Sequence, residues 1–94
     1  MRYIWDAQKS ASNLRKHGVS FLDAVRMFDG GILHWPDERY HYGEERWIAV
    51  GVAQGQEIFV VYIEEGEDVC RIVSARPATR GERALYRRTV GQQD

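Results

Sequence analysis

Apolar residues change their spacing once along this chain, at Gly30-Gly31, and this change limits the fold more than any other feature. Before the two glycines, apolar residues recur three or four positions apart, as they do on one face of an α-helix. After them, short apolar runs of strand length are separated by turn residues. The sequence therefore predicts helices in the first third of the chain and mainly strands after it.

Two helices are predicted before the change of spacing. Asp6 can cap a helix over residues 7–17, and Gly18 follows as the left-handed residue that ends it. Ser20 begins a second helix, which the double glycine ends. A short strand over residues 1–5 precedes both helices.

Four strands are predicted after the change of spacing. Turns are indicated by Gln54-Gly55 and by Gly66 within an acidic stretch. The most apolar strand, over residues 57–63, is expected at the centre of the sheet. The four strands are predicted over residues 32–35, 46–52, 57–63 and 69–75.

The last of these strands has an alternating pattern, which assigns its side chains to two faces. One face is expected to carry Cys70, Ile72 and Ser74, and the other Arg71, Val73 and Ala75. Pro77 is expected to break the strand. Thr79 and Glu82 then form a capping box for a final helix, which should fray before Gly91.

Together these elements predict an α+β fold in a single domain over residues 1–94. N-terminal helices would pack on an antiparallel sheet of three to four strands, followed by a C-terminal helix. We expect one face of the sheet to cover the helices and the other to stay available. A domain of this size has a small core, so a partner that covers apolar surface would stabilise it.

The composition is typical of a globular protein from a reducing compartment. Hydrophobic residues make up 44% of the chain and charged residues 29%, which excludes a disordered chain. The single cysteine, Cys70, excludes an intramolecular disulfide, and its apolar surroundings favour a buried, inert thiol. The sequence has no bilayer-spanning stretch and no signal-peptide pattern, so we expect a cytoplasmic protein without membrane contact.

Charged residues are segregated along the chain. Residues 1–28 carry five basic groups against two acidic ones, and residues 71–94 carry six arginines against two acids. Residues 29–68 carry ten acids against Arg39 and Arg46. If the two ends meet in space, they form a basic face that can bind a polyanion. Solvated helix surface is the alternative, and the acidic middle would point elsewhere, toward a basic partner.

The common cofactor and metal motifs are missing from the sequence. His34 and His41 have no matching pattern of carboxylates around them, so we predict no metal site. The sequence has no P-loop and no dinucleotide-binding fingerprint, and we predict no cofactor.

Candidates for acid–base and phosphate chemistry lie near predicted element ends. The imidazole of His17 suits proton transfer near neutral pH, although its place in a last helical turn is also explained by the helix dipole. Arg76 follows the last strand, where its guanidinium could hold a phosphate in a fork. A salt bridge from Arg76 to Glu82 or to the acidic turn is the alternative.

Arg46 and Tyr86 carry similar pairs of interpretations. Arg46 begins a predicted strand directly after Glu44-Glu45, so it can bind phosphate or form a local ion pair. Tyr86, in the final helix, can stack on a base or pack in the core, and core packing is preferred.

Several segments together resemble the BrnT family of ribonuclease toxins. The resemblance runs from Tyr3 to about Tyr86, and it is weakest over residues 30–42. The matching segments are Trp5-Asp6-x-x-Lys9, Asn13-x-x-Lys16-His17-Gly18-Val19-Ser20-Phe21, Glu44-Glu45-Arg46 leading into Ile48-Ala49-Val50-Gly51, and Arg71-Ile72-Val73-Ser74-Ala75-Arg76-x-Ala78-Thr79-x-x-Glu82-Arg83-x-x-Tyr86.

The resemblance implies a RelE-like fold and a ribonuclease that stops translation in the bacterial cytoplasm. It implies neutralisation by a BrnA-type antitoxin with a ribbon-helix-helix part, in a heterotetramer with two copies of each protein. The complex would repress its own operon, and the toxin would contact DNA only indirectly, through the antitoxin. No cofactor is implied.

The resemblance also implies a metal-independent mechanism in which a ribose 2′-hydroxyl attacks the neighbouring phosphorus. Arg46 and Arg76 would hold the phosphate, and Lys9 would add positive charge. His17 or Glu45 would be the general base, with His17 preferred. The groups expected along the rest of the RNA are Arg80, Arg83 and Tyr86.

Two other readings of the sequence stay open. The first is a non-catalytic module that binds RNA or the antitoxin through the same basic face. The second, ranked lower, is a structural subunit whose acidic middle docks a basic partner.

Overall fold

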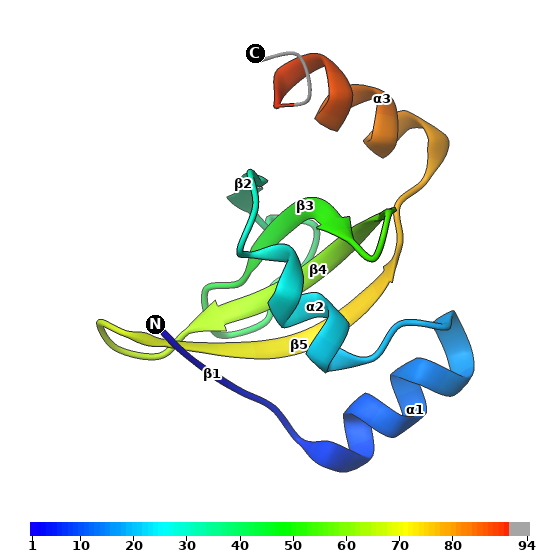
Figure 1. The fold of residues 1–94 in the computed structure, drawn as a ribbon. Helices are drawn as coiled ribbons and strands as arrows, with labels where there is room; N and C mark the ends of the chain where they lie inside the picture. Colours follow the sequence, from blue (N-terminus) through cyan, green and yellow to red (C-terminus); the bar gives the residue numbers. More distant parts are fainter. Residues whose placement is uncertain (91–94) are drawn as a thin grey trace.

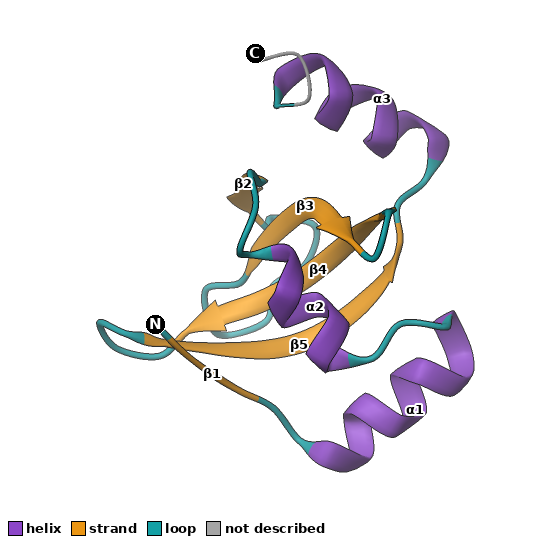
Figure 2. Ribbon diagram, in the orientation of Figure 1, coloured by secondary structure: helices purple, strands orange, loops and turns teal. Residues whose placement is uncertain are grey.

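The structure, a computed structural model, describes residues 1–90 and has the predicted α+β architecture (Figure 1). One strand and two helices begin the chain, four strands follow, and one helix ends it. The strands β3, β4 and β5 form a meander (Figure 2). The elements are β1 (Arg2–Ile4), α1 (Ala7–His17), α2 (Phe21–Met27), β2 (Leu33–Pro36), β3 (Trp47–Ala53), β4 (Gln56–Glu64), β5 (Val69–Pro77) and α3 (Arg80–Thr89).

The sheet has five strands in the order β1-β5-β4-β3-β2, with β4 at its centre as predicted. Its strands β2 to β5 pair antiparallel, which agrees with the expected meander. The additional strand is β1, which pairs in parallel with the first residues of β5, from Val69 to Arg71. The short strand predicted over residues 1–5 is therefore a fifth strand of the sheet. The predicted sheet of three to four antiparallel strands did not include it, because a three-residue strand does not indicate its pairing partner.

Local signals fixed the ends of the helices. The Asp6 carboxylate accepts hydrogen bonds from the backbone N–H groups of Gln8 and Lys9, and Gly18 adopts the left-handed conformation with φ 75°. The capping box of Thr79 and Glu82 begins α3 as predicted. Gly91, before which this helix was expected to fray, lies outside the described residues.

The predicted alternation along β5 was wrong in its second half because the strand contains a bulge. Val61 of β4 pairs with Ser74, but the next residue, Tyr62, pairs with Ile72, so Val73 is an extra residue. Ala75 consequently packs in the same core as Ile72. The expected break at Pro77 was also wrong, since Pro77 still pairs with β4 as the last residue of the strand.

Both faces of the sheet are covered, which corrects the expectation of an available face. The helix α2 covers one face, as Figure 1 shows, and α1 packs on α2 and on β5. On the other face α3 contributes Tyr86 to a second apolar cluster. The buried members of that cluster are Ile48, Val50, Phe59, Val61, Ala78 and Tyr86.

The thiol of Cys70 is buried, as expected from its apolar surroundings. Burial raises its pKa to about 12, so the thiol stays protonated at neutral pH. No helix in residues 1–90 is both long and apolar enough to cross a membrane.

Candidate functional site

The helix α1 lies along the part of the β5 edge that β1 leaves open. The buried Asn13 side chain accepts a hydrogen bond from the backbone N–H of Ala75 and donates one to its carbonyl, at 3.2 and 2.6 Å. It also donates to the carbonyl of Val19 at 2.8 Å. Asn13 thus completes the hydrogen bonding of the strand edge and fixes the exposed side of α1, with Lys9 and His17, beside β5.

Two adjoining hollows follow this junction, and Lys9 lines both of them. The first contains Lys16 and His17 from α1 together with Ser74 of β5. The second contains Arg46, ahead of β3, and Arg71 of β5. We call the surface formed by both hollows the basic groove. Its basic residues are Lys9, Lys16, His17, Arg46 and Arg71, and the carboxylates of Asp6 and Glu44 also line it.

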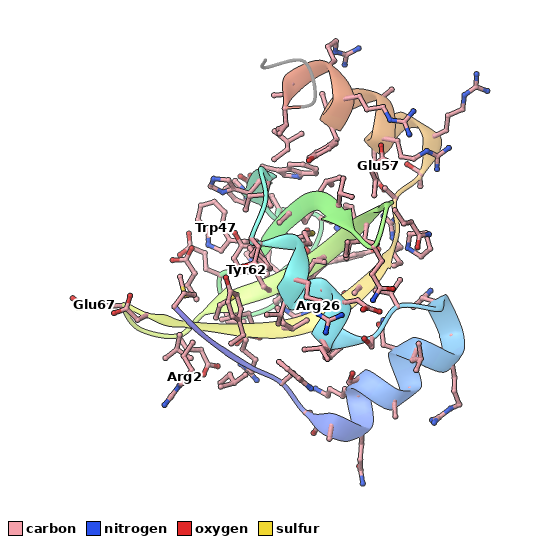
Figure 3. All side chains as sticks on the ribbon, in the orientation of Figure 1. Arg2, Arg26, Trp47, Glu57, Tyr62 and Glu67 are labelled. Carbon is pink, nitrogen blue, oxygen red and sulfur yellow. The ribbon has the colours of Figure 1, made fainter. Side chains whose placement is uncertain are left out.

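The expectation that basic groups from the two ends of the chain meet is thereby confirmed for Lys9 and Arg71. The expectation that the acidic middle points elsewhere is wrong. Glu65 pairs with Arg71 at 2.6 Å, and Glu57 pairs with Arg87 at 2.6 Å. Figure 3 shows Glu57 at the end of the sheet nearest α3. These carboxylates hold arginines in place and partly neutralise the basic surface.

The guanidinium of Arg46 is half-buried at one wall of the basic groove. Its Cζ lies 4.0 Å from the ring centre of Tyr42, and its Nη2 lies 3.3 Å from a carboxylate oxygen of Glu44. The local ion pair considered as the alternative is therefore present. The buried Nε of Arg46 has no hydrogen-bond acceptor within residues 1–90, so the fork retains an unused donor.

Arg76 lies near the end of β5, two residues beyond Ser74 and on the same face of the strand. Its guanidinium stacks on Phe59 at 3.9 Å and donates to both carboxylate oxygens of Glu82, at 2.8 and 2.9 Å. The salt bridge considered as the alternative is therefore formed. Burial raises the pKa of Glu82, but the hydrogen bonds from Arg76 and Thr79 outweigh it and leave that pKa below its ordinary value.

A second guanidinium, that of Arg39, also lies over the Phe59 ring, with its Cζ 5.4 Å from the ring centre. Arg39 is held by Asp37, whose side chain is fully buried and accepts from Nε and Nη2 at 2.8 and 2.9 Å. The Tyr42 hydroxyl donates to the same carboxylate at 3.0 Å. The hydrogen bonds from Arg39 lower the pKa of Asp37 to about 2, against the burial that raises it.

The sequence analysis did not identify Arg71 as a residue of the basic groove, nor Asp37 and Arg39 as residues of the hollow next to it. The spacing Asp-x-Arg directly after Pro36 was a usable signal, because an aspartate at the start of a loop often accepts hydrogen bonds from the backbone two residues later. The backbone N–H of Arg39 donates to Asp37 in this way at 3.2 Å. Arg71 appeared only as one member of an alternating strand.

The two candidate bases lie in different hollows. His17 is exposed in the last turn of α1 and lines the basic groove. Glu45 is exposed in the segment between β2 and β3 and lines a separate, larger hollow together with Arg46. Arg46 therefore stands between them.

The candidates in α3 lie away from the groove. Tyr86 is only 8% exposed, and its hydroxyl donates to the carbonyl of Gly31 at 2.9 Å. Its ring is in the second core and offers no face to a base, so core packing is the interpretation that the structure supports. Arg80 is exposed at the first residue of α3, and Arg83 donates to the carbonyl of Ala78 at 2.9 Å. Neither arginine lines the groove, and Arg76, which the resemblance placed with Arg46 on the phosphate, does not line it either.

Over residues 1–90, the structure brings no three His, Cys, Asp or Glu side chains together in a group that could hold a metal ion. The cationic side chains that line the groove are those of lysine and arginine. Together with the imidazole of His17, these groups are able to hold a phosphate and to move a proton.

Comparisons with family models and with solved structures give the same result. Residues 5–82 match the model of a family described as "Ribonuclease toxin, BrnT, of type II toxin-antitoxin system". Among solved structures, the crystal structure of the Brucella abortus ribonuclease toxin BrnT is similar, with a TM-score of 0.67 and 28% sequence identity. The alignment covers 85% of this chain and 99% of that chain. The sequence matches no curated protein.

Proposed function

This chain belongs to the BrnT family, the ribonuclease toxins of type II toxin–antitoxin systems, and from that premise we propose that it is a metal-independent endoribonuclease that works in the basic groove. The substrate is RNA in the bacterial cytoplasm. Its cleavage inhibits translation, and an antitoxin of the BrnA type prevents it.

Cleavage of this kind needs a general base, a general acid and positive charge. A base takes the proton of a ribose 2′-hydroxyl, whose oxygen attacks the adjacent phosphorus, and an acid protonates the departing 5′-oxygen. Positive groups stabilise the charge that develops on the phosphate oxygens. The products are a cyclic phosphate and a free 5′-hydroxyl, so no water is consumed in the step.

The observation that carries the proposal is the position of Lys9, which lines the hollow of His17 and the hollow of Arg46. A phosphate above this ammonium group would have the hollow that contains His17 on one side and the hollow that contains Arg46 on the other. In the proposed mechanism Lys9 and Arg46 hold the phosphate and His17 is the general base. Glu45 is the second candidate for the base, on the far side of Arg46.

Arg76, Arg80 and Arg83 are proposed to guide the RNA beyond the groove. Arg76 extends the line of positive charge along β5, and its Glu82 partner keeps the fork oriented. The exposed Arg80 and the half-buried Arg83 continue the line onto α3. Their contribution is electrostatic, through the phosphate backbone.

Single substitutions in the purified chain test these roles. Arg46→Ala and Lys9→Ala are each expected to lower the rate of RNA cleavage by about 10²–10³-fold, because each removes one stabilising cation. His17→Ala is expected to cost about 10²–10⁴-fold. The matched control is Arg26→Ala, an exposed cation on α2 (Figure 3), which should leave the rate unchanged.

Two observations would contradict the proposal. One is cleavage that stops in the presence of EDTA, since the groove supplies its own cations. The other is full activity in the Arg46→Ala and Lys9→Ala variants. Binding of RNA without cleavage by the wild-type chain would favour the non-catalytic module instead.

The partner proposed for the chain is a BrnA-type ribbon-helix-helix antitoxin, in a heterotetramer with two copies of each protein. The type II family implies an antitoxin partner, while its class and the stoichiometry are our proposal. Co-expression should relieve growth arrest, and light scattering of the purified complex should give the mass of two copies of each chain. DNA binding is expected for the complex and not for the toxin alone.

A further inference from the structure

A further hollow lies outside the basic groove, between Pro36 and Arg46, with a volume of about 550 Å³. Its walls carry an exposed aromatic ring, Tyr40, which is 70% exposed, and three exposed carboxylates, Glu38, Glu44 and Glu45. An exposed tyrosine ring in such a hollow is available for stacking on a base.

The hollow is built on an ordered frame. The backbone N–H of Asp37 donates to the carbonyl of Arg46 at 2.7 Å, which closes the base of the segment. The Asp37 carboxylate holds Arg39 and Tyr42, and the guanidinium of Arg46 stacks on the Tyr42 ring. The ring of Tyr40 contacts that of Tyr42 edge to face, with centres 5.8 Å apart.

The hollow and the basic groove share one wall, formed by Arg46 and its ion-pair partner Glu44. A phosphate held by Arg46 therefore lies at the border between them. The base of the nucleotide attached to that phosphate is within reach of the hollow, whereas the groove itself has no exposed Tyr, Trp or Phe ring among its lining residues.

We propose that this hollow binds one base of the RNA beside the scissile phosphate, and that the base is guanine. The inference rests on the proposed nuclease function and assigns its sequence preference. Tyr40 stacks on the base, and a carboxylate of Glu45 or Glu38 reads its edge.

Guanine is the base whose edge matches this chemistry. Its N1–H and N2–H groups are adjacent donors that one carboxylate can accept together, whereas adenine and cytosine present a single amino group to it. Uracil presents carbonyl oxygens on both sides of its one N–H, and these repel a carboxylate. Of the acidic side chains here, Asp37 already binds Arg39 and Glu44 binds Arg46, while Glu38 and Glu45 enter no ion pair within residues 1–90.

Mapping of cut ends in a random RNA pool tests the assignment. The wild-type chain should enrich guanine at one position next to the cut. Tyr40→Ala should lower cleavage by about 5- to 100-fold through lost stacking, and Tyr40→Phe, which keeps the ring, should cleave as the wild type does. Glu45→Gln separates the two roles considered for this residue. If Glu45 reads the base, the variant loses the guanine preference. If Glu45 is the general base, the variant cleaves every sequence more slowly.

A binding measurement tests the hollow without relying on cleavage. Titration of the purified chain with 5′-GMP should shift the NMR signals of residues 38–46 at lower concentration than titration with 5′-UMP. Equal shifts with both nucleotides, or shifts confined to α1 and β5, would overturn the assignment even if the chain cuts RNA. Preferential binding of 5′-GMP by a chain that cuts nothing would support the hollow and contradict the nuclease.

A protein ligand for the hollow is the main competitor, because a basic side chain of the antitoxin could fill the same acidic walls. In that case Tyr40→Ala would weaken inhibition by the antitoxin and leave the bases at the cut sites unchanged. That outcome would overturn the proposal.

Discussion

The carboxylate of Asp37 is fully buried and accepts four hydrogen bonds, three from Arg39 and one from Tyr42. In the sequence, the same aspartate is one acid among ten in the middle of the chain. A buried charge persists only when donors surround it, and these donors are assembled by the turn after β2. The role of this residue therefore depended on a loop conformation that apolar spacing does not report.

Asp37→Asn should destabilise the fold by about 1–3 kcal/mol, since it removes hydrogen bonds to a charged acceptor. The effect should depend on pH. The pKa of Asp37 falls from 3.8 to about 2 on folding, so its stabilisation is complete above pH 4 and is lost as the pH falls toward 2.

Urea unfolding at pH 7 and pH 3 measures this contribution. The wild type should lose part of its free energy of unfolding at pH 3, and the Asp37→Asn variant should lose less. Glu67→Gln, at the exposed turn between β4 and β5 (Figure 3), is the control and should behave as the wild type does. A variant with unchanged stability at pH 7 would show that the Arg39 contacts contribute nothing.

Among the elements, α1 depends on a single side chain for its attachment to the sheet. Asn13 takes the place of a missing strand along the open edge of β5, and the predicted helix boundaries said nothing about this contact. The position was predicted only as part of a helix with a polar sequence. Hydrogen bonds between residues 62 positions apart in the chain leave no local signal.

Asn13→Ala should destabilise the fold by about 2–4 kcal/mol, because each buried backbone group left without a partner costs roughly 1–3 kcal/mol. Thermal or urea unfolding measures the loss, and Gln8→Ala on the exposed side of α1 is the control. Since α1 carries Lys9 and His17, cleavage should fall more than Gln8→Ala lowers it, even at temperatures where the variant is folded. Wild-type stability would contradict the role given to this side chain.

Replacing either of two glycines, Gly51 of β3 or Gly81 of α3, by alanine should change the stability of the fold, in opposite directions. A Cβ atom at Gly51 would lie 2.6 Å from Cγ of the buried Met27, so Gly51→Ala should destabilise the fold by about 1–3 kcal/mol. At Gly81, in the first turn of α3, a Cβ atom meets nothing within 4 Å. Gly81→Ala should therefore stabilise the fold by about 0.5 kcal/mol, since glycine is the poorer helix former. The two midpoints of urea unfolding should move in opposite directions, and a shift of both in one direction would contradict the packing.

At the scale of the whole molecule, a net charge of −1 conceals a basic surface. The carboxylates of the middle segment pair with Arg46, Arg71 and Arg87, while Lys9 and Lys16 line the groove without an ion pair within residues 1–90. Attraction of RNA then depends on this local surface and not on the overall charge.

RNA binding should therefore weaken steeply with salt. Three cations of the groove in contact with phosphates predict a slope of about −2 for log K against log salt concentration, at roughly −0.7 for each phosphate of a single strand. Lys9→Ala should make the slope less steep by about 0.7, and Arg26→Ala on α2 should not change it. A slope near zero in the wild type would exclude binding through the groove.

What the sequence determined by itself was the local structure: the caps of α1 and α3, the turns, the central place of β4, the inert Cys70 and the family. The caps and turns depend on hydrogen bonds and steric preferences between residues a few positions apart, and the other features follow from apolar runs and motifs that can be read along the chain. The tertiary structure decided the parallel pairing of β1, the bulge at Val73, the covering of the second face by α3, and the meeting of Lys9 with Arg46. Each of these joins residues distant in the chain, and packing of the complete core selects such contacts.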